Sequence, residues 1–81
     1  MGVERIRKAI LTFPAEVEGE DLKLLVMCVV MESGCLTSLA DRVVTIKDPY
    51  GRGELDKFLK ESELVVELVG GGVTIEKFEN L

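Results

Sequence analysis

The chain has 81 residues, of which 47% are hydrophobic and 31% are charged, and its net charge at neutral pH is −5. This composition is typical of one small folded domain covering residues 1–81 and argues against a disordered chain. The acidic balance argues against binding to nucleic acid, because phosphate contacts require clustered Lys and Arg side chains. No run approaches the roughly 20 apolar residues that span a bilayer, so we expect no membrane partner.

The chain contains no His, and its two cysteines, Cys28 and Cys35, lie seven positions apart. The missing imidazole removes the usual activating base of Ser and Cys nucleophiles and the commonest transition-metal ligand. The cysteine spacing matches neither a zinc site nor a redox motif, so we interpret both residues as free thiols. The N-terminal residues show no signal-peptide pattern. We therefore expect a cytoplasmic protein without metal or cofactor, and an enzyme is the less favoured class.

The most hydrophobic segment is Leu22–Met31, LKLLVMCVVM, whose only charged residue is Lys23. Successive side chains of a strand point to opposite faces of a sheet. As a strand, this segment would be hydrophobic on both faces. We therefore predict a central strand that is covered on both sides and ends before Gly34.

The segment before it, Ala9–Val17, alternates between apolar and polar residues, which predicts a strand. Pro14 lacks a backbone donor, so it places this strand at an edge or beside a bulge. A helix over residues 3–13 is the alternative, since apolar residues there also recur at offsets of three and four. The turn Glu18–Asp21, which contains a Gly, would join the two strands as an antiparallel hairpin.

Two short elements are predicted after Gly34. Residues 37–42 offer a Thr or Ser cap for one short helical turn. Arg42–Lys47 is rich in β-branched residues and predicts a strand with Val44 and Ile46 on one face.

The clearest helix signal lies at Glu54–Glu61, after a turn at Asp48–Gly53 that is indicated by its Pro and Gly residues. Leu55, Phe58 and Leu59 recur at helical spacing, and acidic residues occupy the first turn. A helix this short is stable when its apolar side packs on a sheet.

A second hairpin is predicted at the C-terminal end, with strands at Leu64–Val69 and Val73–Phe78 joined through glycines 70–72. A loop centred one residue later would oppose Glu67 and Glu76, which repel each other. The favoured register gives an inner face made of Leu64, Val66, Leu68, Val73 and Ile75.

Together these elements predict an α+β fold. We expect a small, mostly antiparallel sheet of about five strands, formed by two hairpins and a short strand. The helix at 54–61 packs on this sheet, and a second short helix near 37–42 is the remaining option.

One short helix cannot cover both faces of such a sheet, and exposed apolar area usually marks a partner surface. We therefore predict an interaction or assembly domain that forms a homo-oligomer through an apolar sheet face, or binds another protein there. The predicted interface residues are Leu25, Met27, Val29, Met31, Val65, Val69 and Phe78.

The alternative function is a regulatory module that binds an anionic or phosphate-bearing ligand at the 48–53 turn. Backbone N–H groups at a helix N-terminus favour anions, Arg52 adds a forked donor, and Tyr50 offers a ring for stacking. Glu54 would oppose an anion, and the turn is neither a Walker loop nor a dinucleotide-binding motif. A separate basic patch, Arg5, Arg7 and Lys8, is interpreted as a solvated strand edge. The predicted ligand-binding residues are Tyr50, Gly51, Arg52 and Gly53.

Overall fold

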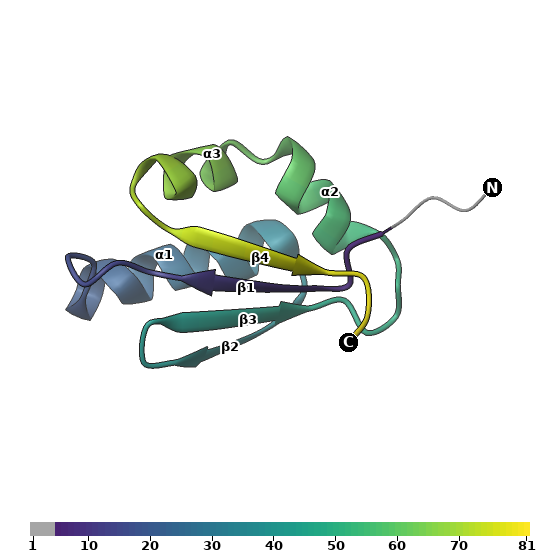
Figure 1. Ribbon diagram of the computed structural model, residues 1–81, viewed down its shortest axis with the longest axis horizontal. Helices are drawn as coiled ribbons and strands as arrows, with labels where there is room; N and C mark the ends of the chain where they lie inside the picture. Colours follow the sequence, from purple (N-terminus) through teal and green to yellow (C-terminus); the bar gives the residue numbers. More distant parts are fainter. Residues whose placement is uncertain (1–4) are drawn as a thin grey trace.

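The computed structural model describes residues 5–81 as an α+β domain with four strands and three helices (Figure 1). Within these residues, no helix is long and apolar enough to cross a membrane. In chain order the elements are β1 (Lys8–Thr12), α1 (Gly19–Ser33), β2 (Leu36–Ala40), β3 (Val43–Lys47), α2 (Glu54–Glu61), α3 (Glu63–Gly70) and β4 (Thr74–Phe78).

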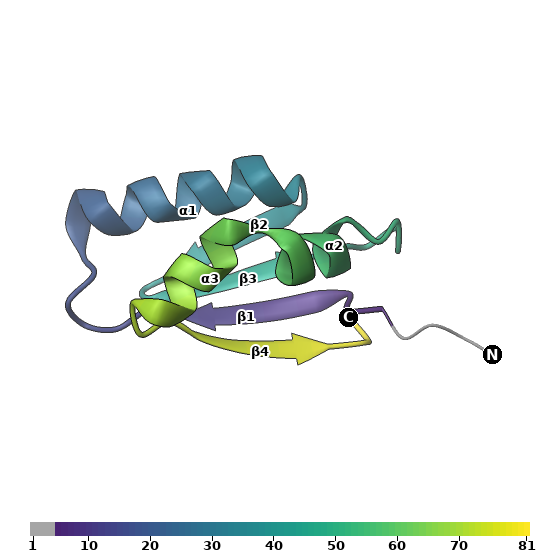
Figure 2. The same ribbon diagram turned by 90° about the horizontal axis from the view of Figure 1, so that it is seen from above.

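The four strands form one sheet in the order β2-β3-β1-β4, and every neighbouring pair is antiparallel. β3 is inserted between β1 and β2, and β1 is inserted between β3 and β4, so the sheet combines two split β-α-β units, as in ferredoxin-like domains. All three helices lie on one face of the sheet (Figure 2). The two views together place α1 toward β2 and β3, and α3 toward β4. Among residues 5–81, no helix lies on the other face of the sheet.

The core lies between the sheet and the helices. In the register of β1 with β3, Ala9 is opposite Ile46 and Leu11 is opposite Val44, and all four side chains are fully buried. The predicted strand at 42–47, with two apolar residues on one face, is therefore confirmed. The helices complete this core with Leu22, Val29, Leu55, Phe58, Leu59, Val65 and Leu68.

The segment Leu22–Met31 lies in α1, so the predicted central strand is wrong. Leu22 and Val29 are buried and seven positions apart, with half-buried Leu25 between them, which is the spacing of one side of a helix. Because almost every residue here is apolar, the segment satisfies the strand period and the helix period equally. α1 ends at Ser33 and is capped by Gly34, where φ is 65° and the backbone N–H donates to the Val30 carbonyl.

β1 confirms a strand in the Ala9–Val17 region, although it is shorter and covers Lys8–Thr12. The predicted edge position is wrong, because β1 lies between β3 and β4. Pro14 follows the end of the strand and therefore removes no sheet hydrogen bond. The alternative helix over residues 3–13 is also wrong for residues 5–13, and its first two residues lie outside the described part of the chain.

Residues 37–42 form no helical turn. β2 runs through Leu36–Ala40 and pairs with β3 through a two-residue turn, Asp41-Arg42. Asp41 has a φ of 57°, a left-handed conformation that Asp tolerates in tight hairpins. This hairpin replaces the predicted one at Glu18–Asp21, where the chain instead enters α1.

Of the predicted C-terminal hairpin, one strand is confirmed and the other is wrong. Val73–Phe78 contains the strand β4, but β4 pairs with β1. The predicted partner strand, Leu64–Val69, lies within α3, where Val65 and Leu68 face the core at helical spacing. Ser62 caps this helix by accepting a hydrogen bond from the backbone N–H of Leu64 (3.2 Å). The total is therefore four strands instead of about five, whereas α2 has the predicted bounds, 54–61.

Candidate functional site

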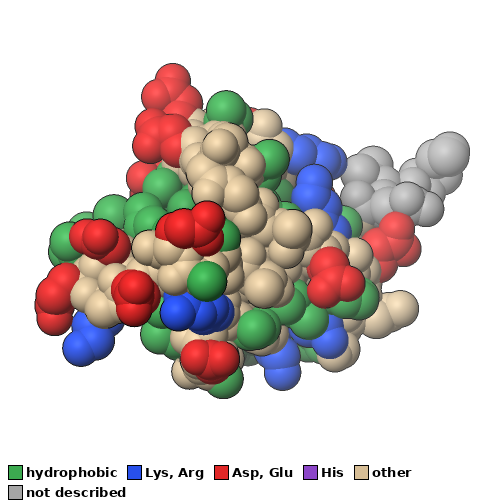
Figure 3. All heavy atoms as spheres, turned by 60° about the vertical axis from the view of Figure 1, so that its left-hand side comes forward, with side chains coloured by type: hydrophobic (Ala, Val, Ile, Leu, Met, Phe, Trp, Pro, Cys, Tyr) green, Lys and Arg blue, Asp and Glu red, His purple; other side chains and the backbone are tan. Residues whose placement is uncertain are grey.

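Exposed hydrophobic side chains gather on the outer side of α1 and on the neighbouring strand β2. Met31 is 78% exposed and Leu36 is 65% exposed, which is unusual for side chains of this size. We call this region the α1–β2 surface; it comprises Leu24, Met27, Val30, Met31, Leu36 and Leu39. Figure 3 shows hydrophobic side chains gathered on the left of that view, between groups of acidic side chains.

The structure brings together only part of the predicted interface. Met27 and Met31 are both exposed on α1, whereas Val69 is exposed on α3. Val29 and Val65 are buried in the core. The remaining two, Leu25 and Phe78, are half-buried, and Phe78 lies under the Lys8 ammonium at 4.8 Å.

Four residues of the α1–β2 surface were not predicted: Leu24, Val30, Leu36 and Leu39. A helical interpretation of residues 22–31 would have found Leu24, because it lies three and seven positions before Met27 and Met31. No comparable signal marks β2, because its exposure depends on its place at the edge of the sheet.

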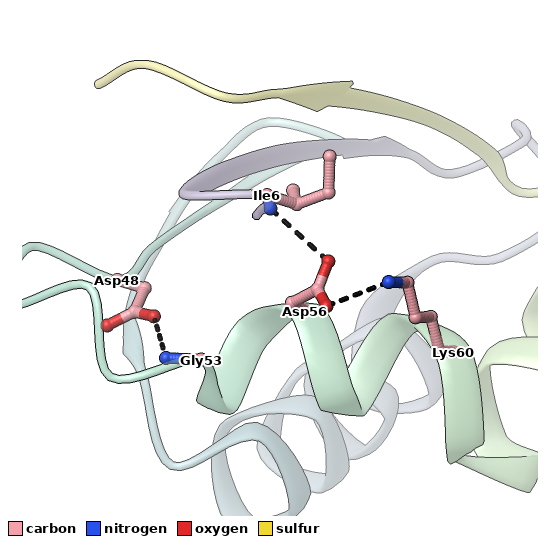
Figure 4. A network of polar contacts seen from close by, with 5 residues as sticks. All are labelled: Ile6, Asp48, Gly53, Asp56 and Lys60. Atoms are coloured by element: carbon pink, nitrogen blue, oxygen red, sulfur yellow. Dashed lines mark hydrogen bonds and ion pairs between the residues drawn. The ribbon is translucent and has the colours of Figure 1, made fainter. Parts of the chain in front are cut away.

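The 48–53 turn is organised around Asp48, whose side chain is buried at the start of α2 (Figure 4). Its carboxylate accepts hydrogen bonds from the backbone N–H groups of Arg52 (3.3 Å) and Gly53 (3.0 Å). Gly53 is the N-cap residue of α2, with a φ of 88°. The chain itself therefore supplies the negative group that these N–H donors and the helix dipole favour.

The basic residues before β1 also meet this turn. The Arg7 guanidinium donates to the Pro49 carbonyl (2.6 Å), and the Arg5 guanidinium donates to the Gly51 carbonyl (3.2 Å). The Arg52 guanidinium lies over the exposed Tyr50 ring, 5.2 Å from its centroid. The predicted ligand-binding residues therefore share one corner of the molecule with two further arginines.

The same close view shows how α2 contacts the segment before β1 (Figure 4). The Asp56 carboxylate accepts a hydrogen bond from the backbone N–H of Ile6 (3.3 Å) and pairs with the Lys60 ammonium (3.0 Å). The hydrogen bond from Lys60 is the main reason that the pKa of Asp56 is lowered. This network is structural, because it ties α2 to the N-terminal segment.

A hollow of about 370 Å³ separates the end of α1 from α2 and is bordered by Glu32, Glu54 and Lys57. An adjoining hollow of about 280 Å³ runs past Cys35 to the 48–53 turn. Burial, followed by the nearby Asp48 and Glu54 carboxylates, raises the pKa of the Cys35 thiol, which disfavours a reactive thiolate. Across residues 5–81, no three His, Cys, Asp or Glu side chains form a group that would hold a metal ion.

Comparison with protein-family models, with curated proteins and with solved structures found no match for this chain. The α1–β2 surface and the 48–53 turn are therefore the two features of the molecule that indicate a function.

Proposed function

We propose that this protein is a small interaction or assembly domain that self-associates through the α1–β2 surface. One observation supports the proposal: among residues 5–81, six of the ten exposed large hydrophobic side chains lie on α1 and β2. Five of the six lie on α1 or on the helix-covered face of β2, and these two elements contact each other. The sixth, Leu36, is opposite Lys47 in the register and lies on the free face at the same edge.

The physical reason is the composition of α1. A helix that is apolar on all sides is stable when all sides are covered, but the sheet covers only one side of α1. The free face of the sheet is a weaker candidate for an apolar interface because it carries the charged residues Lys8, Lys47 and Glu76. We therefore place the interface on the α1 side and along the β2 edge, where Leu36 also lies.

Sedimentation velocity over a wide range of protein concentrations tests this proposal. We expect a mass above the 8.9 kDa of one chain, which falls toward that value on dilution. Met27→Lys should favour the monomer, because it places a charge in the apolar surface. The matched control is Val66→Lys, an apolar position on α3 that is also largely exposed. A monomer at every concentration would contradict the proposal.

A second candidate function is binding of an anionic ligand at the 48–53 turn. The observation that favours it is the approach of Arg5 and Arg7 to the turn that already contains Arg52. The Asp48 carboxylate opposes it, because it occupies two backbone donors that an anion would use. Titration with inorganic phosphate, followed by amide NMR, tests this function: the Arg52 and Gly53 signals should shift in the natural protein, and the affinity should fall in Arg52→Ala.

A further inference from the structure

The two edges of the sheet differ in charge. The edge strand β4, TIEKF, carries Glu76 and Lys77, whereas the edge strand β2, LTSLA, carries no charged residue. Both strands are five residues long, so strand length does not distinguish them. Proteins commonly protect free sheet edges with charged residues, because an uncharged edge pairs readily with another strand. β2 is therefore the edge that is open to pairing.

The hydrogen bonds of β3 show which backbone groups of β2 are directed outward. Phe13 N–H donates to the carbonyl of Arg42 (2.9 Å), and Asp48 N–H donates to the carbonyl of Arg7 (2.9 Å). The residues before and after β3 thus bond toward β1, and bonding directions alternate along a strand. Val43, Thr45 and Lys47 accordingly bond toward β2.

The partners of these three residues in the register are Ala40, Ser38 and Leu36. The alternate residues, Thr37 and Leu39, consequently direct their backbone N–H and C=O groups away from β3, toward the free edge. Two residues of β2 are therefore oriented to bond another strand.

We propose that β2 pairs antiparallel with β2 of a second copy of this chain, about a two-fold axis at Ser38. This inference rests on the proposed self-association and specifies its geometry. Thr37 would exchange backbone hydrogen bonds with Leu39 of the partner subunit, and the same pair would recur on the other side of the axis. Two sheets of four strands would then become one continuous sheet of eight.

The charge pattern favours a second copy as the occupant. In this register Leu36 faces Ala40 of the partner subunit and Ser38 faces its own counterpart, so no like charges are opposed. The joined sheet would end at β4 on both sides, where Glu76 and Lys77 disfavour addition of further strands. The two-fold arrangement therefore closes as a dimer and does not extend into a filament.

One side of α1 adds apolar area along the same edge. The Glu32 carboxylate accepts a hydrogen bond from the Ser62 hydroxyl (2.8 Å), so this side of α1 faces α2 and α3. Consecutive helical residues are about 100° apart, which places Val30 on the opposite side of α1, above β2, with Met27 close to it. Leu39, on the helix-covered face of β2, is 42% exposed. Pairing of β2 would bring these three side chains toward the same groups of the second copy.

Disulfide trapping tests this geometry. In a Cys28→Ser/Cys35→Ser background, Ser38→Cys places two thiols at the axis, where directly opposite residues are close enough for a disulfide bond. We expect mild oxidation to give a covalent dimer. The matched control is Thr74→Cys, an exposed hydroxyl residue on the charged edge β4, which should form no covalent dimer under the same oxidation. Equal cross-linking at both edges would overturn the proposed pairing.

A second variant tests the same axis without oxidation. Ser38→Lys would oppose two ammonium groups, and we expect the dissociation constant of the dimer to rise by about fivefold, the effect of like charges directly opposite in a sheet. Thr74→Lys should leave it unchanged, and thermal unfolding of both variants checks that they fold.

The outcomes separate this inference from the proposed function. If the natural protein associates, but Ser38→Cys does not cross-link and Ser38→Lys does not weaken association, the strand pairing is wrong and the α1–β2 surface remains the proposed interface. If the natural protein is monomeric at all concentrations, both proposals are wrong.

Discussion

The helices α1 and α2 pack on the same face of the sheet but differ in their outer sides. α2 buries Leu55, Phe58 and Leu59 and presents mostly charged residues to solvent. α1 buries Leu22 and Val29 in the same core, but its outer side is also apolar. Packing against the sheet therefore accounts for all the apolar residues of α2 but for only about half of those of α1. The exposed apolar side of α1 is therefore available to a partner.

The largest expected difference is between leucines on the inner side of α2 and the outer side of α1. Leu55 is 0% exposed, so Leu55→Ala should lower the free energy of unfolding by about 2–5 kcal/mol. Leu24→Ala removes the same atoms from an exposed position and should change the stability of the monomer by less than about 0.5 kcal/mol. Urea unfolding at low protein concentration measures both. A comparable loss in both variants would mean that the outer side of α1 is covered within one chain.

The starts of the two helices provide the next contrast. Asp48→Ala removes the acceptor for two backbone N–H groups at the start of α2 and should cost about 1–3 kcal/mol of stability. Glu18 is the N-cap residue of α1, but its side chain makes no capping hydrogen bond. Glu18→Ala should therefore have little effect in the same urea unfolding experiment. If Asp48→Ala also had little effect, the turn would not depend on this carboxylate.

The reactivity of the two thiols tests the difference in exposure between α1 and the residues just after it. Cys28 is exposed on α1, whereas burial raises the pKa of Cys35. Since the thiolate is the reactive form, we expect a water-soluble aromatic disulfide to react at least about tenfold faster with Cys28 at neutral pH. The Cys28→Ser and Cys35→Ser variants assign the two phases of the reaction. Equal rates would contradict the burial of Cys35.

The smallest expected effect concerns the ion pairs of the two helices. Asp56 on α2 has a pKa below its ordinary value near 3.8, chiefly because of its hydrogen bond with Lys60. A lowered pKa in the folded state stabilises the protein above the ordinary value, and this contribution is lost as pH falls through the folded pKa. Because Lys60 is exposed to solvent, the contribution should be below about 1 kcal/mol.

Urea unfolding between about pH 6 and pH 2 checks this sign. Asp56→Asn should remove part of the loss of stability in acid. Glu20→Gln on α1 is the control, because its pair with Lys23 is long (3.9 Å) and exposed on both sides. An acid profile that Asp56→Asn leaves unchanged would contradict the assigned role of this network.

Prediction from sequence was accurate where charged and turn residues interrupt the hydrophobic pattern. Glu54–Glu61 has one apolar side, charged residues elsewhere and a Pro-Gly turn before it, and it is a helix with those bounds. Arg42–Lys47 and Val73–Phe78 also contain strands, because β-branched residues alternate there with polar ones. For the candidate site, Met27 and Met31 were identified, although as residues of a strand.

The two longest segments that were predicted wrongly are those where these interruptions are missing. Leu22–Met31 and Leu64–Val69 are apolar at almost every position, so strand and helix periods fit them equally well. Both are helical in the fold. In the sheet β1 pairs with β3 and β4, so neither segment serves as a strand beside it. Instead, both lie in helices that connect strands across the covered face of the sheet. Tertiary packing therefore decided their secondary structure.

By itself, the sequence determined an α+β domain with a surplus of apolar residues, since composition and local periodicity depend only on neighbouring positions. Only the tertiary structure decided where that surplus lies. Strand order places β2 at an edge, and one-sided packing leaves the outer side of α1 in solvent. Both outcomes depend on contacts between residues far apart in the chain, which local patterns do not contain.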